Sequence, residues 1–115
     1  MWGRLRRRCL PRQQEDYRHV TVRLPGTPVT VHTADGERLA AWHVPPPAAG
    51  PVGVGVLVAH GFSGSLERDE VQAIGRAFAA YGAVLLLSHR GHGASTGFST
   101  LGDREVLDVD AAVRT

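Results

Sequence analysis

Two apolar strands with a helix between them constrain the fold of this 115-residue chain more than any other feature. The first strand is expected over residues 52–59 (VGVGVLVA) and the second over residues 83–88 (AVLLLS). In the first strand, valine, leucine, alanine and glycine fill both alternating faces. Such strands are typical of a parallel sheet that helices cover on both sides. The sequence therefore predicts a parallel βαβ unit with a right-handed crossover.

The segment that connects these strands predicts an amphipathic helix. Ser65 is the expected N-cap, and Gly82 is expected to end the helix. Acidic residues follow Ser65 within the first turns, where the helix dipole favours negative charge. One apolar stripe recurs at helical spacing and should face the sheet, and it consists of Val71, Ile74, Phe78 and Tyr81.

Shorter strands are expected before this unit. Residues 29–44 alternate as two strands, and the Asp35-Gly36 pair between them predicts a tight hairpin turn because glycine supplies the positive φ. Residues 18–24 resemble another short strand, and the prolines of residues 25–28 indicate a turn between them.

A second helix is expected after the unit. Thr100 and Asp103 have the spacing of a capping box, so this helix should begin near Asp103. Its inward residues are expected to be Val106, Val109 and Val113. The fold class is thus α/β: antiparallel hairpin strands, a parallel βαβ unit and the start of a further helix.

The basic character of the chain belongs to an N-terminal arm, residues 1–17, which precedes one domain over residues 18–115. The first twenty residues hold six Arg and two acids, whereas the other 95 hold seven Arg and nine acids. We interpret the arm as a solvated tail, with an RNA or membrane-surface contact as the alternative. No apolar run approaches the roughly 20 residues of a membrane helix. We expect a cytoplasmic protein with neither a membrane span nor a nucleic-acid partner.

Metal and cofactor sites are not expected. Cys9 is alone, which excludes an internal disulfide and a cysteine-based cluster. His89 and His92 are three residues apart, but no third ligand has a matching spacing. The chain also lacks G-x-x-x-x-G-K-[ST], and GVGVLV lacks the third glycine of a dinucleotide-binding turn.

The glycine-rich turn after the first strand, HGFSGS, is the first candidate site. Ligands bind at the carboxyl ends of parallel strands, where backbone amides face a crevice. We expect Gly61 to allow a sharp turn, so that the Phe62 N–H can face a developing oxyanion. The alternatives are a turn that binds nothing and a turn that holds a small anion on its amides.

Two motifs together resemble the α/β-hydrolases, with bacterial serine aminopeptidases and lysophospholipases most similar. His60-Gly61-Phe62 follows the first strand, and the sequence RGHGAS (residues 90–95) follows the second. The resemblance runs from about residue 20 to residue 115. It implies that Phe62 donates its N–H to the oxyanion and that His60, Gly61 and Phe62 contact substrate. It also implies a supporting, non-catalytic loop made of Arg90, Gly91, His92, Gly93 and Ser95.

The family usually has Asp where this chain has Ser88, which leaves the usual hydrogen bonding of the second loop open. Residues 93–97 (GASTG) also match the G-x-S-x-G of a nucleophile. That turn needs a strand ending at its first glycine and a helix starting at once. Here further loop residues separate Ser95 from both elements, so we do not expect Ser95 to be the nucleophile.

The resemblance implies that the nucleophile, acid and histidine of the triad would all follow Thr115. We therefore expect an N-terminal portion of an ester or amide hydrolase that carries the oxyanion turn and is inactive alone. Its partner would be a small-molecule substrate in the full-length form. The strand over residues 52–59 should have an open apolar edge that favours self-association. The alternative is a non-catalytic α/β module that binds a small anionic ligand or a partner strand.

Overall fold

The computed structural model describes residues 24–48 and 54–115. Within them the chain forms four strands and two helices, in the order β1 (Thr27–His32), β2 (Arg38–Val44), β3 (Gly55–Ala59), α2 (Asp69–Ala79), β4 (Ala83–Leu87) and α3 (Glu105–Arg114). The expectations for the arm, for Cys9 and for a strand over residues 18–24 fall almost entirely on residues outside these ranges. So does the beginning of the strand predicted over residues 52–59.

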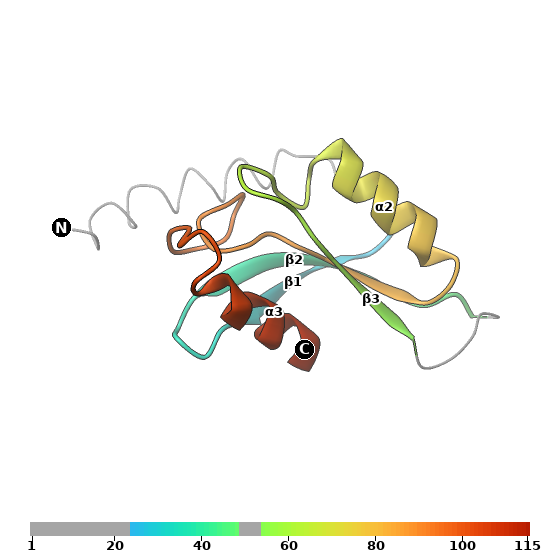
Figure 1. Ribbon diagram of the computed structural model, residues 1–115. Helices are drawn as coiled ribbons and strands as arrows, with labels where there is room; N and C mark the ends of the chain where they lie inside the picture. The colour runs from blue at the N-terminus through green and yellow to red at the C-terminus, as the bar shows by residue number, and fades with distance from the viewer. Residues whose placement is uncertain (1–23, 49–53) are drawn as a thin grey trace.

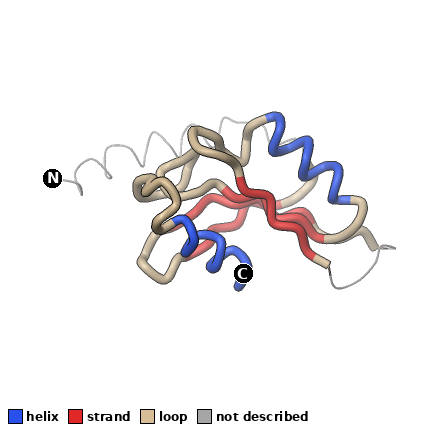
Figure 2. Tube along the Cα trace, viewed as in Figure 1, coloured by secondary structure: helices blue, strands red, loops and turns tan. Residues whose placement is uncertain are grey.

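The four strands form one mixed sheet in the order β1-β2-β4-β3 (Figure 2). β1 pairs antiparallel with β2, and β2 pairs antiparallel with β4. β3 pairs parallel with β4, so that Ala59 lies opposite Leu87 where the two strands end. The predicted α/β class, with a hairpin followed by a parallel βαβ unit, is confirmed.

The hairpin turn is confirmed at Gly36, whose φ of +92° lies in the region that glycine favours. The turn predicted over residues 25–28 is wrong for its second half, whereas Pro25 lies outside the sheet as expected. β1 begins at Thr27 and includes Pro28, which pairs with Trp42 of β2. Among the described strands, β1 lies at the edge of the sheet, where proline is tolerated because one side of the backbone needs no ladder partner.

The two helices cover opposite faces of the sheet (Figure 1). On the α2 face, a core cluster contains Leu24, Val44, Val58, Leu66, Val71, Val84 and Leu86. On the α3 face, a second cluster contains Val31, Leu39, Ala41, Leu87, Ala111 and Ala112. The central strands β2 and β4 contribute to both clusters, which explains why β4 is apolar throughout.

The predicted start of the first helix is wrong by three residues. α2 begins at Asp69, and its N-cap, Arg68, makes no side-chain capping hydrogen bond. Ser65 instead lies in a preceding turn, where its carbonyl accepts the Arg68 N–H at 3.2 Å. The helix ends at Ala79, before Gly82.

The predicted buried stripe of this helix is also wrong. Val71 is buried, but the other three predicted residues are between 44% and 63% exposed. The buried positions of α2 are Val71, Gln72 and Gly75. A Cβ at Gly75 would lie 2.8 Å from Leu86 and 3.0 Å from Leu24. The helix therefore packs closely against the core at Gly75, and Ile74 and Phe78 remain exposed, as does Tyr81 after the end of the helix.

The predicted inward residues of α3 are also wrong. Val106, Val109 and Val113 are 37% to 74% exposed, whereas Asp108, Ala111 and Ala112 are buried. Alanine lets this helix lie close to the sheet, and Asp108 turns inward to meet a buried arginine that is described below. The predicted capping box is wrong as well: the Thr100 hydroxyl accepts the Arg104 N–H at 2.8 Å and donates to the carboxylate of Glu105, and it does not bond Asp103.

Candidate functional site

A cavity of about 270 Å³ lies at the carboxyl ends of β3 and β4, beside the start of α3. The turn after β3 contributes His60, Gly61 and Phe62, and the loop after β4 contributes His89 and His92. The segment that enters α3 closes it with Ser99, Leu101, Gly102 and Glu105. The cavity thus joins the two loops that the sequence singled out.

The turn after β3 does not bend where we expected. Gly61 is not among the residues with positive φ, and a Cβ there would meet nothing within 4 Å. The left-handed residue is Ser63, with φ of +65°. Such values are uncommon outside glycine, so the surrounding contacts must hold Ser63 in place. Those contacts include the Ser63 N–H and carbonyl, which bond His92 and Arg68 respectively.

The N–H of Phe62 makes no hydrogen bond within the described residues. The Gly61–Phe62 peptide unit is fixed through its carbonyl. The Gly61 carbonyl accepts hydrogen bonds from His60 Nδ1 at 2.5 Å and from the Gly64 N–H at 3.0 Å. Carbonyl and N–H lie on opposite sides of a trans peptide plane. Phe62 thus lines the cavity with a backbone N–H that has no partner among the described residues, in a peptide unit whose carbonyl is fixed.

Two histidines join the turn after β3 to the loop after β4. His60 Nε2 accepts the His89 N–H at 2.9 Å, and His92 Nε2 accepts the Ser63 N–H at 3.1 Å. Each histidine thus binds the backbone of the other's loop. The rings of His60 and His92 lie 4.8 Å apart, and the His92 ring also packs edge-on against Phe62 at 5.8 Å.

His60 is held in its neutral form. Burial is the main reason that its pKa lies below the ordinary value, and the nearby His92 and His89 lower it further. The hydrogen bond to the Gly61 carbonyl opposes this shift only in part. A neutral ring suits the geometry, because a protonated Nε2 could not accept the His89 N–H.

The loop after β4 is anchored by a buried arginine. The Arg90 guanidinium lies 2.7 Å from Asp35 of the hairpin turn and 2.8 Å from Asp108 of α3. Asp108 also accepts the Arg90 N–H at 2.9 Å and lies 3.2 Å from His89 Nδ1. This network connects three segments that are distant in sequence, and it places His89 at the cavity wall.

The charges of this network are mutually stabilised. Burial would raise the pKa of Asp108, but hydrogen bonds from His89 and Arg90 outweigh it and lower the pKa. Hydrogen bonds from Arg90, and then from Thr33, hold the pKa of Asp35 well below its usual range. The same contacts with Asp35, supported by Asp108, raise the pKa of Arg90 against the effect of burial.

Ser95 is completely buried and does not line the cavity. Its Oγ donates to the Ser88 carbonyl at 2.6 Å and accepts the Ala40 N–H at 2.8 Å. The hydroxyl therefore connects β2 to the end of β4. Ser88, at the position where the family usually has Asp, accepts the Leu66 N–H on its own hydroxyl at 2.9 Å.

Two glycines of the second loop have a left-handed backbone conformation. Gly91 has φ of +75°, and a Cβ there would lie 2.6 Å from the Ser99 nitrogen. Gly93 has φ of +51°. Both positions require a left-handed backbone, which glycine adopts without steric cost. The loop can therefore fold back tightly enough to bring His89 and His92 to one wall.

The sequence interpretation missed several residues that build this site. Asp35 was considered only as a turn residue, and no role at the site was predicted for Asp108. Glu105 lines the cavity; burial would raise its pKa, but hydrogen bonds from Thr100 and Ser99 lower it to about 2. One signal was available for Asp108: it is three residues before Ala111 and thus on the face that packs against the sheet.

Potential metal ligands do not cluster in the described ranges. No group of three or more His, Cys, Asp or Glu side chains there could hold a metal ion. None of the described helices is long and apolar enough to cross a membrane.

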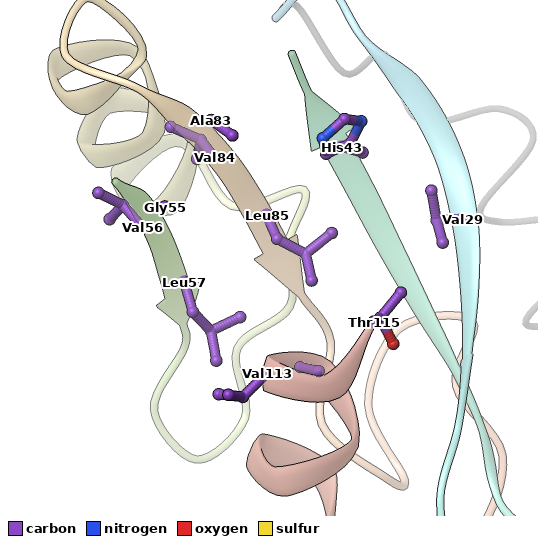
Figure 3. Close-up of a pocket in the computed structure, with 11 residues that line it drawn as sticks. Val29, His43, Gly55, Val56, Leu57, Ala83, Val84, Leu85, Val113 and Thr115 are labelled. Atoms are coloured by element: carbon purple, nitrogen blue, oxygen red, sulfur yellow. The ribbon is translucent and has the colours of Figure 1, made fainter. Parts of the chain in front are cut away.

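A second hollow, of about 440 Å³, lies on the α3 face of the sheet near Thr115 (Figure 3). Val29, Leu57 and Leu85 line it from three strands, and Val113 borders it from α3. Its lining is mostly apolar, with His43 and Thr115 as the polar side chains, and it lacks the cluster of titratable groups found in the first cavity. The cavity between the two loops is therefore the candidate functional site.

Neither a protein-family model nor a curated protein sequence matches the chain. Solved structures do match it. The esterase Pf2001 from Pyrococcus furiosus superposes with a TM-score of 0.70 and 26% identity, over 81% of this chain and 36% of the esterase. XC6422 from Xanthomonas campestris, an α/β serine hydrolase without a lid, has a TM-score of 0.68 and 26% identity, over 77% and 43%.

The α/β-hydrolase GrgF from a Penicillium species matches with a TM-score of 0.63 and 27% identity, over 79% of this chain and 32% of its own. The chain thus spans between about a third and two fifths of the length of these structures. It has the fold of the N-terminal portion of an α/β-hydrolase, as the two motifs implied.

Proposed function

We propose that this chain supplies the oxyanion-binding part of a serine hydrolase that cleaves ester or amide bonds in small molecules. The observation that carries the proposal is the Phe62 N–H, which is unbonded within the described residues at the carboxyl end of β3. A donor that is fixed before the reaction stabilises the negative charge that develops on the carbonyl oxygen. One such donor contributes about 3–4 kcal/mol to transition-state stabilisation in known hydrolases.

The remaining catalytic groups would belong to a longer polypeptide. In α/β-hydrolases the nucleophile, acid and histidine follow one another along the chain, and the residue after the nucleophile gives the second oxyanion donor. Ser95 cannot be the nucleophile, because its hydroxyl is buried and bonded to the Ser88 carbonyl and the Ala40 N–H. The names of the matched structures, an esterase and a serine hydrolase, support the reaction class.

The open strand edge supports a related proposal about partners. Among the described strands, β3 pairs only with β4, and Val54 just before it is 58% exposed. An unpaired edge beside an apolar groove favours pairing with a further strand. We expect that strand to come from the longer polypeptide, and the 115-residue chain alone to self-associate. Val54→Lys should shift it towards monomer in size-exclusion chromatography with light scattering, and a monomeric wild-type chain would contradict this expectation.

The reaction is tested by reading the coding sequence past residue 115 and expressing the whole frame. The proposal expects G-x-S-x-G, then an acid, then a histidine, with hydrolysis of p-nitrophenyl esters. Phe62→Pro, which removes the N–H, should lower kcat by about 10²- to 10³-fold. Phe62→Ala keeps the N–H and is the matched control.

Two results would overturn the proposal. One is a frame that ends without these residues, which would favour a non-catalytic module that binds a small anion at the same cavity. The other is an active enzyme in which Phe62→Pro hydrolyses the ester as fast as Phe62→Ala.

A further inference from the structure

The two histidine bonds between the loops form a reciprocal pair, which we call the histidine clasp: His60 bonded to the His89 N–H, and His92 bonded to the Ser63 N–H. In both rings Nε2 is the acceptor, so the proton of each neutral ring is on Nδ1. Both Nδ1 atoms have carbonyl partners that confirm this assignment: Gly61 at 2.5 Å for His60 and Arg90 at 3.0 Å for His92.

The clasp acts on the peptide unit that carries the unused donor. His60 Nδ1 holds the Gly61 carbonyl, and the Phe62 N–H lies on the opposite side of the same peptide plane. The next N–H along the chain, that of Ser63, is occupied by His92. The clasp therefore orients the Phe62 N–H, and it occupies the Ser63 N–H so that this second amide is not available to a ligand.

We propose that His60 and His92 are positioning residues for the Phe62 amide, and that they act only as neutral imidazoles protonated on Nδ1. This inference rests on the proposed function for the role of that amide. The clasp itself is a property of the loops and can be tested without any enzymatic activity.

Several charged or titratable groups surround the clasp. From the loop after β4, the His89 ring lies 5.2 Å from the His60 ring, and Arg90 follows it. From α3, Asp108 bonds His89, and Glu105 lines the same cavity. From the turn after β3, Arg68 bonds the Ser63 carbonyl.

These surroundings favour a neutral His60, whose pKa is lowered mainly by burial. The carboxylates do not reverse this effect, because Asp108 and Glu105 are engaged by Arg90 and by Thr100. Acidification would place a proton on Nε2 of His60, facing the His89 N–H. The clasp should then open, and the Phe62 amide should lose its fixed orientation.

The test uses nitrogen-15 NMR of the 115-residue chain near neutral pH. The imidazole resonances of His60 and His92 should both report the Nδ1–H tautomer. The amides of Ser63 and His89 should exchange with deuterium about tenfold or more slowly than that of Phe62, relative to their intrinsic rates. Either ring in the Nε2–H form, or a Ser63 amide that exchanges as fast as that of Phe62, would overturn the proposal.

Two conservative variants separate positioning from a merely structural role. The side-chain amide of Asn overlays Nδ1 of histidine, whereas that of Gln reaches Nε2. His60→Asn should therefore preserve the Phe62 amide resonance while the His89 amide loses its protection. His60→Gln should do the reverse, and His32→Gln, on the exposed surface of β1, should change neither. If the two variants at position 60 behave alike, His60 does not act through the Gly61 carbonyl.

The two proposals can fail separately. If the clasp is present but the continued polypeptide lacks hydrolase activity, the proposed function is wrong and the clasp stands as a property of the loops. If the enzyme depends on the Phe62 N–H but the rings have the other tautomer, only the positioning role is wrong.

Discussion

Arg90 meets Asp108 through three nitrogen atoms, with Nη2 at 2.8 Å, Nε at 2.9 Å and the backbone N–H at 2.9 Å, and both side chains are buried. This pair fixes the loop after β4 to the first turns of α3. Because His89 and His92 belong to the same loop, the pair also determines where one wall of the cavity lies. The site is thus supported by a charge network outside the cavity.

Replacing Asp108 should therefore destabilise the whole domain. Asp108→Asn removes one carboxylate from a buried arginine, and breaking a buried ion pair in this way costs about 3–5 kcal/mol. Urea denaturation measures the loss. Asp110→Asn is the matched control, since Asp110 pairs with Arg114 on the exposed side of the same helix at 3.0 Å. An exposed pair contributes at most about 1 kcal/mol, so equal losses in the two variants would contradict the network.

Ser95→Ala should also reduce stability, although the hydroxyl is small. The substitution leaves the Ala40 N–H and the Ser88 carbonyl without their partner in a buried place. An unsatisfied buried group costs about 1–3 kcal/mol. Thermal unfolding of Ser95→Ala can be compared with that of Ser65→Ala, whose hydroxyl has no hydrogen bond within the described residues. If both variants melt like the wild type, Ser95 does not connect the strands.

Gly82→Ala should be destabilising because of a backbone clash. A Cβ at Gly82 would collide with the carbonyl oxygen of Val54, and overpacking of this kind costs about 1–3 kcal/mol. Gly55→Ala is the control, because a Cβ at that position of β3 would meet nothing within 4 Å. Urea midpoints should fall for the first variant and hold or rise for the second. The reverse order would show that the turn between α2 and β4 does not pack against Val54.

Stability should fall when the pH drops below about 4. Asp35, Glu105 and Asp108 all have pKa values below those of an unfolded chain, that of Glu105 being about 2. Above the unfolded values of about 4 their contribution is complete, and it is lost as the pH falls through the folded values. Unfolding free energies measured between pH 7 and pH 2 give the slope of stability against pH. Asp108→Asn should flatten it, and an unchanged slope would contradict the assignment.

The strand pattern of this fold could be predicted from the sequence because it depends on local features. Runs that are apolar on both faces predicted β3 and β4, and Asp35-Gly36 predicted the hairpin turn. Which side of each helix packs against the sheet could not be predicted in this way. A helical period defines a stripe, but the close approach at Gly75 and the attraction of Asp108 to Arg90 decide which stripe is buried.

The sequence motifs located the two loops of the candidate site, but they did not predict the contacts between these loops. The motifs H-G-F and R-G-H-G indicated the two segments that line the cavity. The histidine clasp connects residues that are 29 positions apart, so no local pattern reveals it. The same limit applies to Asp35, which reaches Arg90 across 55 positions.

The central claim is that the chain contributes an oxyanion donor but no nucleophile. Its most direct test is fluorophosphonate labelling, followed by peptide mass spectrometry, on the 115-residue chain and on the polypeptide encoded by the continued frame. The account predicts no adduct on the chain alone and a single adduct on a serine beyond residue 115 in the longer protein. An adduct on Ser95 in either sample would contradict it.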